Sequence, residues 1–190
     1  LSVATRPDCL PEEVVEYLSE LNRIKPVFVE LGLQTIQEKT AEYIRRGYPL
    51  PVFDDAVKRL KSVGINVVVH VILGLPGESR DDMLETVRYV EKCGADGIKL
   101  QLLHVLRGTD LCADYEKGLF QTLERDEYID ILGDAINILP KNAVIHRLTG
   151  DAPKKLLVSP LWSADKKAVL AAIYRAFKQK NVMQGSKCEN

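Results

Sequence analysis

Polar and charged side chains gather at five points along the chain, each at or just after a strand-like run of apolar residues. The first three groups are Thr5, Arg6 and Asp8; Glu30, Gln34 and Thr35; and His70 with Gly74, Gly77 and Glu78. The last two are Gln101, His104, Arg107 and Thr109, and His146, Arg147, Thr149 and Asp151. The loops after parallel strands build the active site of an α/β barrel, so we expect these groups to meet at one rim.

Each group also has a plainer interpretation. Glu30 and Gln34 lie four residues apart in VELGLQT, so both point to the same side of a strand. A lone buried Glu is more often a paired structural carboxylate, but with a Gln beside it we interpret the pair as ligand-binding. The glycines of GLPGES fit a simple turn or a backbone that approaches a ligand closely. His70, within an apolar strand, fits a histidine of the core. His104 and His146 lie nearer strand ends beside arginines, where a structural role and a ligand-binding role are both open.

The elements that position these groups alternate regularly. Strand-like runs are expected at 1–5, 27–33, 65–73 and 98–105, and amphipathic helices lie between them. Strand and helix in alternation indicate βαβ units and a parallel sheet, an α/β fold. Helix ends are legible as well: Ser79 and Asp82 form the pattern of a capping box before a helix from about residue 80. Three helices are expected to stop at Gly47, Gly64 and Gly94.

After residue 105 the regular alternation of strands and helices ends. Helices are expected near 110–117, 125–138 and 163–179, with a short strand in AVIHRL. The sequence therefore predicts a half-barrel over 1–109, an α-rich appendage over 110–182 packed on it, and a frayed tail over 183–190.

Composition narrows the class of protein. Lys and Arg number 26 against 27 Asp and Glu, so the overall charge favours neither a polyanionic partner nor a membrane surface. No apolar run is long enough to span a bilayer and no leader pattern is visible, so we expect a cytoplasmic protein. The four cysteines form no CxxC pair and are interpreted as reduced thiols. The start at Leu1, inside a strand-like run, suggests an excised segment.

Five motifs in order, TRPD, ELGLQT, RRGY, HVILGLPGE and LLHVLRGT, closely resemble the radical S-adenosylmethionine superfamily. HRLTGDAP followed by PLWS resembles the C-terminal signature of an uncharacterised bacterial Fe–S oxidoreductase group related to the elongator catalytic subunit. The resemblance covers almost the whole chain. It implies a partial TIM-like half-barrel of six parallel strands, of which about four, the third to the sixth, would lie here.

The resemblance also implies roles for individual residues. Arg6 would lie near the methionine moiety of S-adenosylmethionine, Gln34 would face its ribose or methionine end with Glu30 below, and Arg46 would grip its carboxylate. The other implied cofactor contacts are His70, Gly74, Leu75, Leu103 and His104. The implied substrate pocket contains Arg107, His146, Arg147 and Asp151.

The chemistry implied for the full-length protein belongs largely to its cofactors. A [4Fe–4S] cluster on three cysteines spaced CxxxCxxC would reduce S-adenosylmethionine, and the resulting 5′-deoxyadenosyl radical would abstract hydrogen from an unknown substrate, a small molecule or RNA. An electron donor would be required. That cysteine motif is absent from this sequence, so no cluster is expected in this chain and the isolated chain is expected to be inactive.

Two other functions remain open at this point. His70, His104 and His146 could be the ligands of a metal-dependent hydrolase, although no HxH pair accompanies them. The chain could also be a binding or scaffold module that lacks a cluster. The isolated chain, which would lack the first two strands of the implied half-barrel, is expected to expose an unpaired edge at its first strand and so to self-associate.

Overall fold

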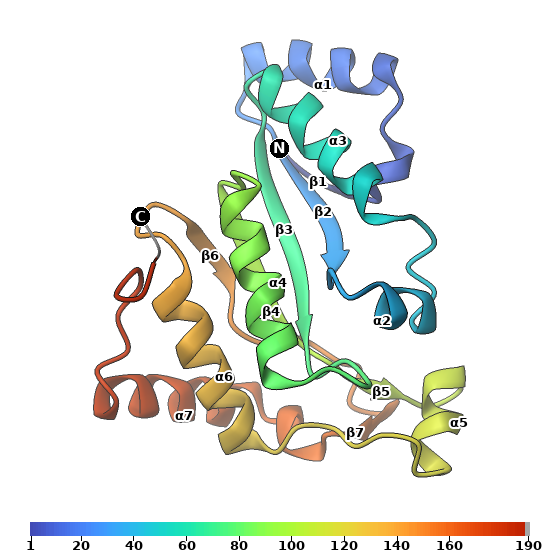
Figure 1. The fold of residues 1–190 in the computed structure, drawn as a ribbon, viewed down its shortest axis with the longest axis vertical. Coiled ribbons are helices and arrows are strands. Elements are labelled where there is room, and N and C mark those ends of the chain that lie inside the picture. Colours follow the sequence, from blue (N-terminus) through green and yellow to red (C-terminus); the bar gives the residue numbers. More distant parts are fainter. Residues whose placement is uncertain (189–190) are drawn as a thin grey trace.

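Five parallel strands form the central sheet of the computed structural model, which describes residues 1–188 (Figure 1). In spatial order they are β1 (Ser2–Thr5), β2 (Phe28–Gln34), β3 (Asn66–Leu73), β4 (Gly97–Leu102) and β6 (Val144–Arg147). Every neighbouring pair is parallel, which confirms the expected α/β fold. β1 has β2 as its neighbour in this order, so its other side is an edge of the sheet.

Helices connect the first four strands. The 3-10 helix η1 (Pro7–Cys9) and α1 (Glu12–Ile24) follow β1, α2 (Glu38–Tyr43) and α3 (Leu50–Ser62) follow β2, and α4 (Arg80–Lys92) follows β3. The predicted capping box is confirmed, because the Asp82 N–H donates to Ser79 Oγ at 3.2 Å and the Ser79 N–H donates to the Asp82 carboxylate at 2.8 Å. Gly64 and Gly94 each have φ of +76°, the left-handed conformation of the residue that follows many right-handed helices.

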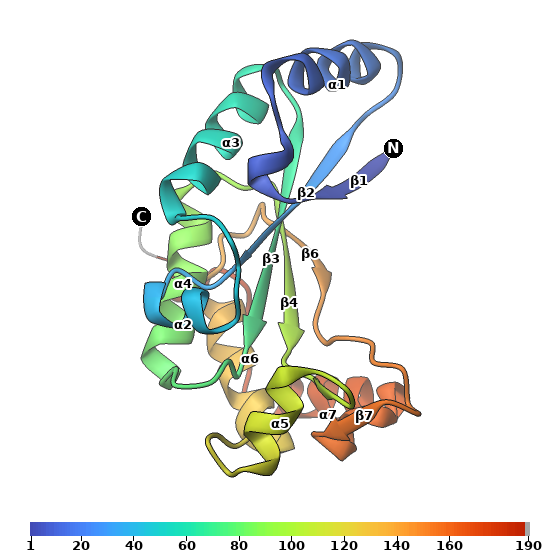
Figure 2. The same ribbon diagram turned by 90° about the vertical axis from the view of Figure 1, so that its right-hand side faces the viewer.

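The two faces of the sheet differ. Val29, Leu31 and Leu33 of β2 are fully buried on the face that packs against helices. Glu30 and Gln34 alternate with them on the opposite face, called here the inner face, and are only half-buried. Figure 2 shows α3 and α4 on one side of the sheet, and within residues 1–188 no helix lies over the middle of the other side. The curved sheet with one helical layer is half of a barrel.

The main sheet contains one strand more than the four expected. AVIHRL was assigned to the appendage, but β6 pairs with β4 and so extends the sheet beyond residue 109. The strand expected over 98–105 is split, because β4 ends at Leu102, where β3 also ends. Val105–Leu106 forms β5, which pairs antiparallel with β7 (Leu157–Ser159) in a separate two-stranded sheet.

The remaining helices are α5 (Asp110–Glu116), α6 (Arg125–Ile138), the 3-10 helix η2 (Leu161–Ala164) and α7 (Lys166–Gln179). They lie in the lower half of the molecule in Figure 1, together with the β5–β7 sheet. Tyr128 of α6 is completely buried and donates through its hydroxyl to Leu148 O at 2.8 Å, which fixes α6 to the end of β6. None of the helices within residues 1–188 is long and apolar enough to cross a membrane.

The predicted fraying of the tail is wrong for the part that the structure describes. Gln184 Nε2 donates to the carbonyls of Pro140 and Ala143, both at 2.7 Å, and the Lys187 N–H donates to Asn137 O at 2.8 Å. These bonds hold residues 184–187 against the end of α6. Residues 189–190 of the predicted tail lie outside the described residues.

Candidate functional site

The carboxyl end of β2 carries the clearest sign of a ligand site. Gln34 has φ of +67°, and the pairing register with β3 shifts between Gly32 and Gln34. A residue other than glycine held in the left-handed region costs energy and often marks a functional position. The Tyr48 hydroxyl donates to Gly32 O and fixes the shifted backbone. Gln34 Oε1 is buried, and among residues 1–188 it has no hydrogen-bond donor.

Arg46 lies beside this point and is almost entirely buried. Its Nη1 donates to Thr35 O at 2.7 Å and its Nε donates to Tyr48 O at 3.0 Å. The guanidinium therefore ties down the chain after β2, a structural task that the sequence did not reveal. Arg46 Nη2 remains without a hydrogen-bond partner in the described part of the chain, with Glu38 Oε1 3.6 Å away.

Tyr48 joins Arg6 to the same cluster. The Arg6 guanidinium carbon is 5.5 Å from the centre of the Tyr48 ring, and that of Arg46 is 5.0 Å from it. Arg6 also grips Asp8 with two hydrogen bonds, of 2.9 and 2.6 Å. The structure thus brings Arg6 and Arg46 against one aromatic ring, whose hydroxyl bonds Gly32 near Gln34. Tyr48 itself was missed.

Gly74 does not complete this cluster as expected. Its φ of +85° requires glycine, but a Cβ there would lie 2.9 Å from Leu123, and its N–H points to Met83 Sδ at 3.1 Å. The side of Gly74 on which a Cβ would lie is therefore packed against protein. Leu75 and Leu103 are likewise buried.

The Glu30 carboxylate is bonded to side chains of three other strands and is not free to bind a ligand. Its Oε1 accepts from Ser2 Oγ at 2.7 Å, and its Oε2 bonds His70 Nε2 at 2.8 Å and the Lys99 ammonium. Burial would raise the pKa of Glu30, but the hydrogen bonds from Lys99, Ser2 and His70 outweigh burial and lower it to about 2. The structure therefore supports the paired structural carboxylate, the plainer of the two interpretations.

His70 is engaged on both ring nitrogens. Gln101 Nε2 lies 3.2 Å from Nδ1, on the other side of the ring from Glu30. Burial lowers the pKa of His70, even though Glu30 acts in the opposite direction. His70 and Glu30 thus lie on the expected inner face, but the polar atoms assigned to cofactor binding already have protein partners.

The three histidines do not assemble into a metal site. His104 Nε2 bonds Ser163 Oγ at 3.0 Å, and His146 stacks edge-on against Phe28 with ring centres 6.4 Å apart. Across residues 1–188, no group of three His, Cys, Asp or Glu side chains could hold a metal ion. The hydrolase alternative is therefore not supported, and His104 is bonded to the protein where a cofactor contact was expected.

Some of the residues expected on the substrate side lie together. His146 and Arg147 line a pocket of about 530 Å³ between β6, α6 and α7, together with Lys166 and Tyr174 of α7, which the sequence reading missed. Asp151 accepts from Lys166 Nζ at 2.7 Å and lies 3.6 Å from Arg147. Lys166 is the main cause of the lowered pKa of Asp151. Arg107, at the end of β5, does not line this pocket.

Glu78 of the third polar group is a half-buried carboxyl whose environment the sequence did not reveal. It is the acid of GLPGES, and its Oε1 atom is buried without a hydrogen-bond partner in the described residues. Burial is the main reason that its pKa is raised to about 7, against hydrogen bonds from Thr35 and Thr40. The signal available in the sequence was its position directly after a buried strand and a glycine turn.

The cysteines do not fit an iron–sulfur cluster. Cys9 is exposed after β1, Cys93 ends α4, Cys112 is buried in α5, and Cys188 follows the last helix. These four positions belong to separate parts of the fold, so they cannot converge on one cluster.

Known proteins match the chain over nearly its whole length. The family model described as the Radical SAM superfamily matches residues 1–90, and the Radical_SAM C-terminal domain matches residues 95–179. The uncharacterized protein YtqA of Bacillus subtilis is 44% identical over 185 residues, 97% of this chain and 58% of the relative. Protein YhcC of Escherichia coli is 34% identical over 187 residues, 98% of this chain and 60% of the relative.

The solved structure of the archaeal Methanocaldococcus infernus Elp3, with an N-terminal deletion, has the same fold. The TM-score is 0.85 with 24% identity, over 97% of this chain and 42% of that one. The chain spans about three-fifths of the length of YtqA and YhcC. Together with the two matching family models, these similarities show that the chain belongs to the radical S-adenosylmethionine superfamily, in a group related to the elongator catalytic subunit.

Proposed function

We propose that this chain is part of a radical S-adenosylmethionine enzyme and that Gln34 and Arg46 bind S-adenosylmethionine at the end of β2. The observation that carries the proposal is a pair of buried polar atoms, Gln34 Oε1 and Arg46 Nη2, that have no hydrogen-bond partner within residues 1–188, although Glu38 Oε1 lies 3.6 Å from Nη2. Buried polar atoms are normally hydrogen-bonded, so an acceptor and a donor that both lack a hydrogen bond at this end of the sheet indicate a ligand. The ribose hydroxyls of this cofactor can donate to an amide oxygen, and its carboxylate can accept from a guanidinium.

The other residues of the cluster position these two groups. Tyr48 fixes the Gly32 carbonyl, and with it the unusual backbone that directs Gln34. The ring of Tyr48 also lies against the Arg46 guanidinium, whose remaining donors are occupied by backbone carbonyls. Bound S-adenosylmethionine supplies a carbon–sulfur bond whose reductive cleavage starts radical chemistry on a substrate. The residues of this chain would bind and orient it and keep water away.

The chain would not catalyse this reaction alone. Its cysteines do not fit the cluster, and about two-fifths of the length of YtqA and YhcC has no counterpart here. We propose that the remainder of the full-length protein supplies the cluster, which receives its electron from a separate donor. The reducing cytoplasm suits such an enzyme.

The test is anaerobic reconstitution of the full-length protein with iron and sulfide, followed by reduction with dithionite and measurement of 5′-deoxyadenosine. The Gln34→Ala variant should bind S-adenosylmethionine about tenfold more weakly, the effect of losing roughly one hydrogen bond. Glu16→Gln, an exposed change on α1, is the matched control and should behave as the parent.

A reconstituted protein with full iron content and no 5′-deoxyadenosine would contradict the proposal. The scaffold alternative would gain support if the coding sequence upstream of Leu1 lacked a CxxxCxxC motif.

A further inference from the structure

The charge of the chain is divided very unevenly along its length. Residues 141–187 contain ten Lys and Arg against two Asp, a net charge of +8. Residues 1–140 contain 16 Lys and Arg against 24 Asp and Glu, a net charge of −8. The overall charge of −1 conceals this division. A strong excess of one sign in a single segment indicates a partner of the opposite sign.

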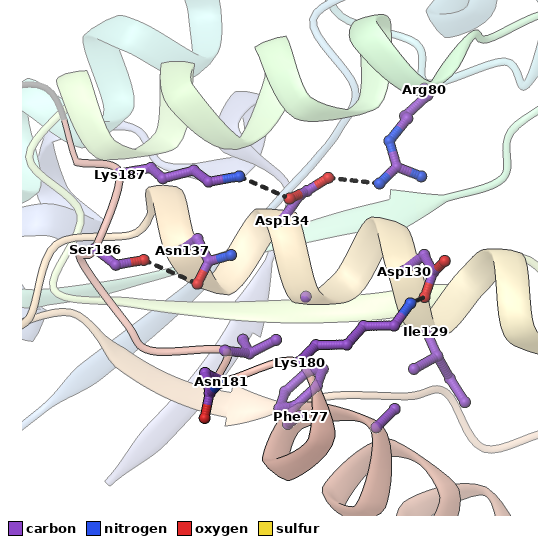
Figure 3. A pocket seen from close by; sticks show the side chains of 13 residues that line it. Arg80, Ile129, Asp130, Asp134, Asn137, Phe177, Lys180, Asn181, Ser186 and Lys187 are labelled. Atoms are coloured by element: carbon purple, nitrogen blue, oxygen red, sulfur yellow. Dashed lines mark hydrogen bonds and ion pairs between the residues drawn. The ribbon is translucent and has the colours of Figure 1, made fainter.

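Some of these basic groups are already neutralised inside the protein. Figure 3 shows Lys180 against Asp130 and Lys187 against Asp134, in the pocket between α6 and the C-terminal segment. The lysines of that pocket are neutralised by these ion pairs, so the pocket does not attract an anion. Lys166 of α7 is bound in the same way by Asp151.

Of the seven basic groups that remain in this segment, three lie along one face of α7. Lys167, Arg175 and Lys178 are exposed, and none of them pairs with an acid within the described residues. At 100° per residue, Lys167, Tyr174 and Lys178 share one face of the helix, with Arg175 beside them. Val169 and Ile173 face the core instead. We call the exposed set Lys167, Tyr174, Arg175 and Lys178 the α7 stripe.

An aromatic ring in this stripe adds a second kind of contact. Tyr174 is 64% exposed, which is unusual for a large ring on a helix that has a buried side available. A ring among cations suits nucleic acid, because bases stack on the ring while phosphates meet the cations. An acidic protein would need the cations alone, and an anionic membrane would need a broader apolar face.

Tyr174 also marks where the stripe meets the pocket of about 530 Å³ beside β6. This pocket is large enough for a nucleoside, and its walls combine apolar groups with His146 and Arg147. Arg147 is in register with Lys99 of the inner face. The pocket therefore adjoins the face on which the barrel would hold its reacting groups.

We propose that the α7 stripe and the adjoining pocket bind RNA at an unpaired loop, with the phosphate backbone along Lys167, Arg175 and Lys178 and a base against Tyr174. Unpaired loops are where proteins read RNA, since their bases can turn outward and stack on aromatic side chains. The acidic remainder of the chain would repel the backbone elsewhere and so orient it. The inference names the substrate class of the proposed enzyme and rests on that proposed function, but RNA binding is measured without the cluster or S-adenosylmethionine.

The test is fluorescence anisotropy with a labelled RNA hairpin that has an unpaired loop, over a series of KCl concentrations. Lys167→Gln with Lys178→Gln should weaken binding at least about tenfold at low salt and reduce the salt slope by about 1.4, since each single-strand phosphate contact contributes about 0.7. The matched control is Lys25→Gln with Lys58→Gln, two exposed lysines in the acidic part, which should bind as the parent does.

Tyr174→Ala separates stacking from charge. It should bind the hairpin about 5- to 100-fold more weakly and bind a fully paired duplex of equal length as the parent does. Circular dichroism should show the same fold for all variants, because every change is on an exposed side chain.

Three results would overturn the proposal. The first is that the double lysine variant and its control bind the hairpin equally well. The second is that vesicles rich in phosphatidylserine bind with the same dependence on Lys167 and Lys178, which would make the stripe a membrane surface. The third is that polyglutamate competes as well as RNA of equal charge. Loss of 5′-deoxyadenosine formation, in contrast, would count against the enzyme and leave these binding results unaffected.

Discussion

His70 Nε2 on β3 lies 2.8 Å from Glu30 Oε2 on β2, on the inner face of the half-barrel. An amide nitrogen can only donate, so Gln101 Nε2 donates to His70 Nδ1, and the proton of a neutral imidazole lies on Nε2. Nε2 therefore donates to Glu30. With Lys99 on the same carboxylate, the network links β2, β3 and β4 and leaves little for a ligand to bind at this depth.

Glu30→Gln should destabilise the fold. The Lys99 side chain is only 17% exposed, and the change leaves its ammonium without a carboxylate partner. An uncompensated charge of this kind costs about 1–3 kcal/mol of unfolding free energy when it is partly buried. Urea unfolding measures the loss, and exposed Glu16→Gln should stay within about 0.5 kcal/mol of the parent. Equal stability of the two variants would mean that the network contributes nothing.

Stability should depend on pH through Glu78. The pKa of Glu78 is raised from 4.5 to about 7 in the folded chain, so its proton is held more tightly when folded. That contribution to stability is complete below about pH 4.5 and is lost as the pH rises through 7. Glu78→Gln lacks the ionisation and should gain about 1–2 kcal/mol on the parent between pH 5 and 8, reduced from the full shift by solvent screening. A constant difference across this range would refute a buried, protonated Glu78.

Gly32→Ala should impair cofactor binding more than folding. The added Cβ would lie 2.8 Å from Gln34 Nε2, the end of a flexible side chain, so the amide must move. The affinity for S-adenosylmethionine should fall about tenfold while the unfolding free energy changes by less than about 1 kcal/mol. Calorimetry on the double variant with Gln34→Ala should show no further loss, because both changes act on one group. Additive losses would contradict this.

The free edge of β1 should promote self-association. In a parallel pair alternate residues bond the neighbouring strand, and Leu1 O accepts from the Phe28 N–H, so the Ala4 N–H points away from β2. Ala4→Pro removes that donor and should shift the protein toward monomer in light scattering. Ala4→Thr keeps the donor and serves as control. Identical behaviour of the two variants would exclude pairing through this edge.

Much of the fold could be predicted because the hydrophobic periodicity of each segment agrees with the capping residues and glycines at its ends. The capping box at Ser79 and the glycines at 64 and 94 are signals that depend on few neighbours. The sheet position of β6 could not be predicted, since a strand of four residues carries no sign of which sheet it joins. The fifth strand was therefore assigned to the appendage.

The sequence indicated the positions of the site residues better than their roles. Gln34 and Arg46 lie together as the motifs implied, but the sequence could not show that Glu30 would find Lys99 sixty-nine residues away. Gly74 was expected to open onto a ligand, and the packing of Leu123 against it was invisible without the fold. The basic segment was overlooked because the net charge was taken over the whole chain.

The most direct measurement is a nuclear magnetic resonance titration of the isotope-labelled chain with S-adenosylmethionine, observing the side-chain amide of Gln34 and the Nε–H of Arg46. If their unpaired atoms bind the cofactor, these two signals should shift together with a single dissociation constant, and Gln34→Ala should weaken the shift at Arg46. Saturable shifts confined to other residues, with both of these signals unmoved, would contradict the account.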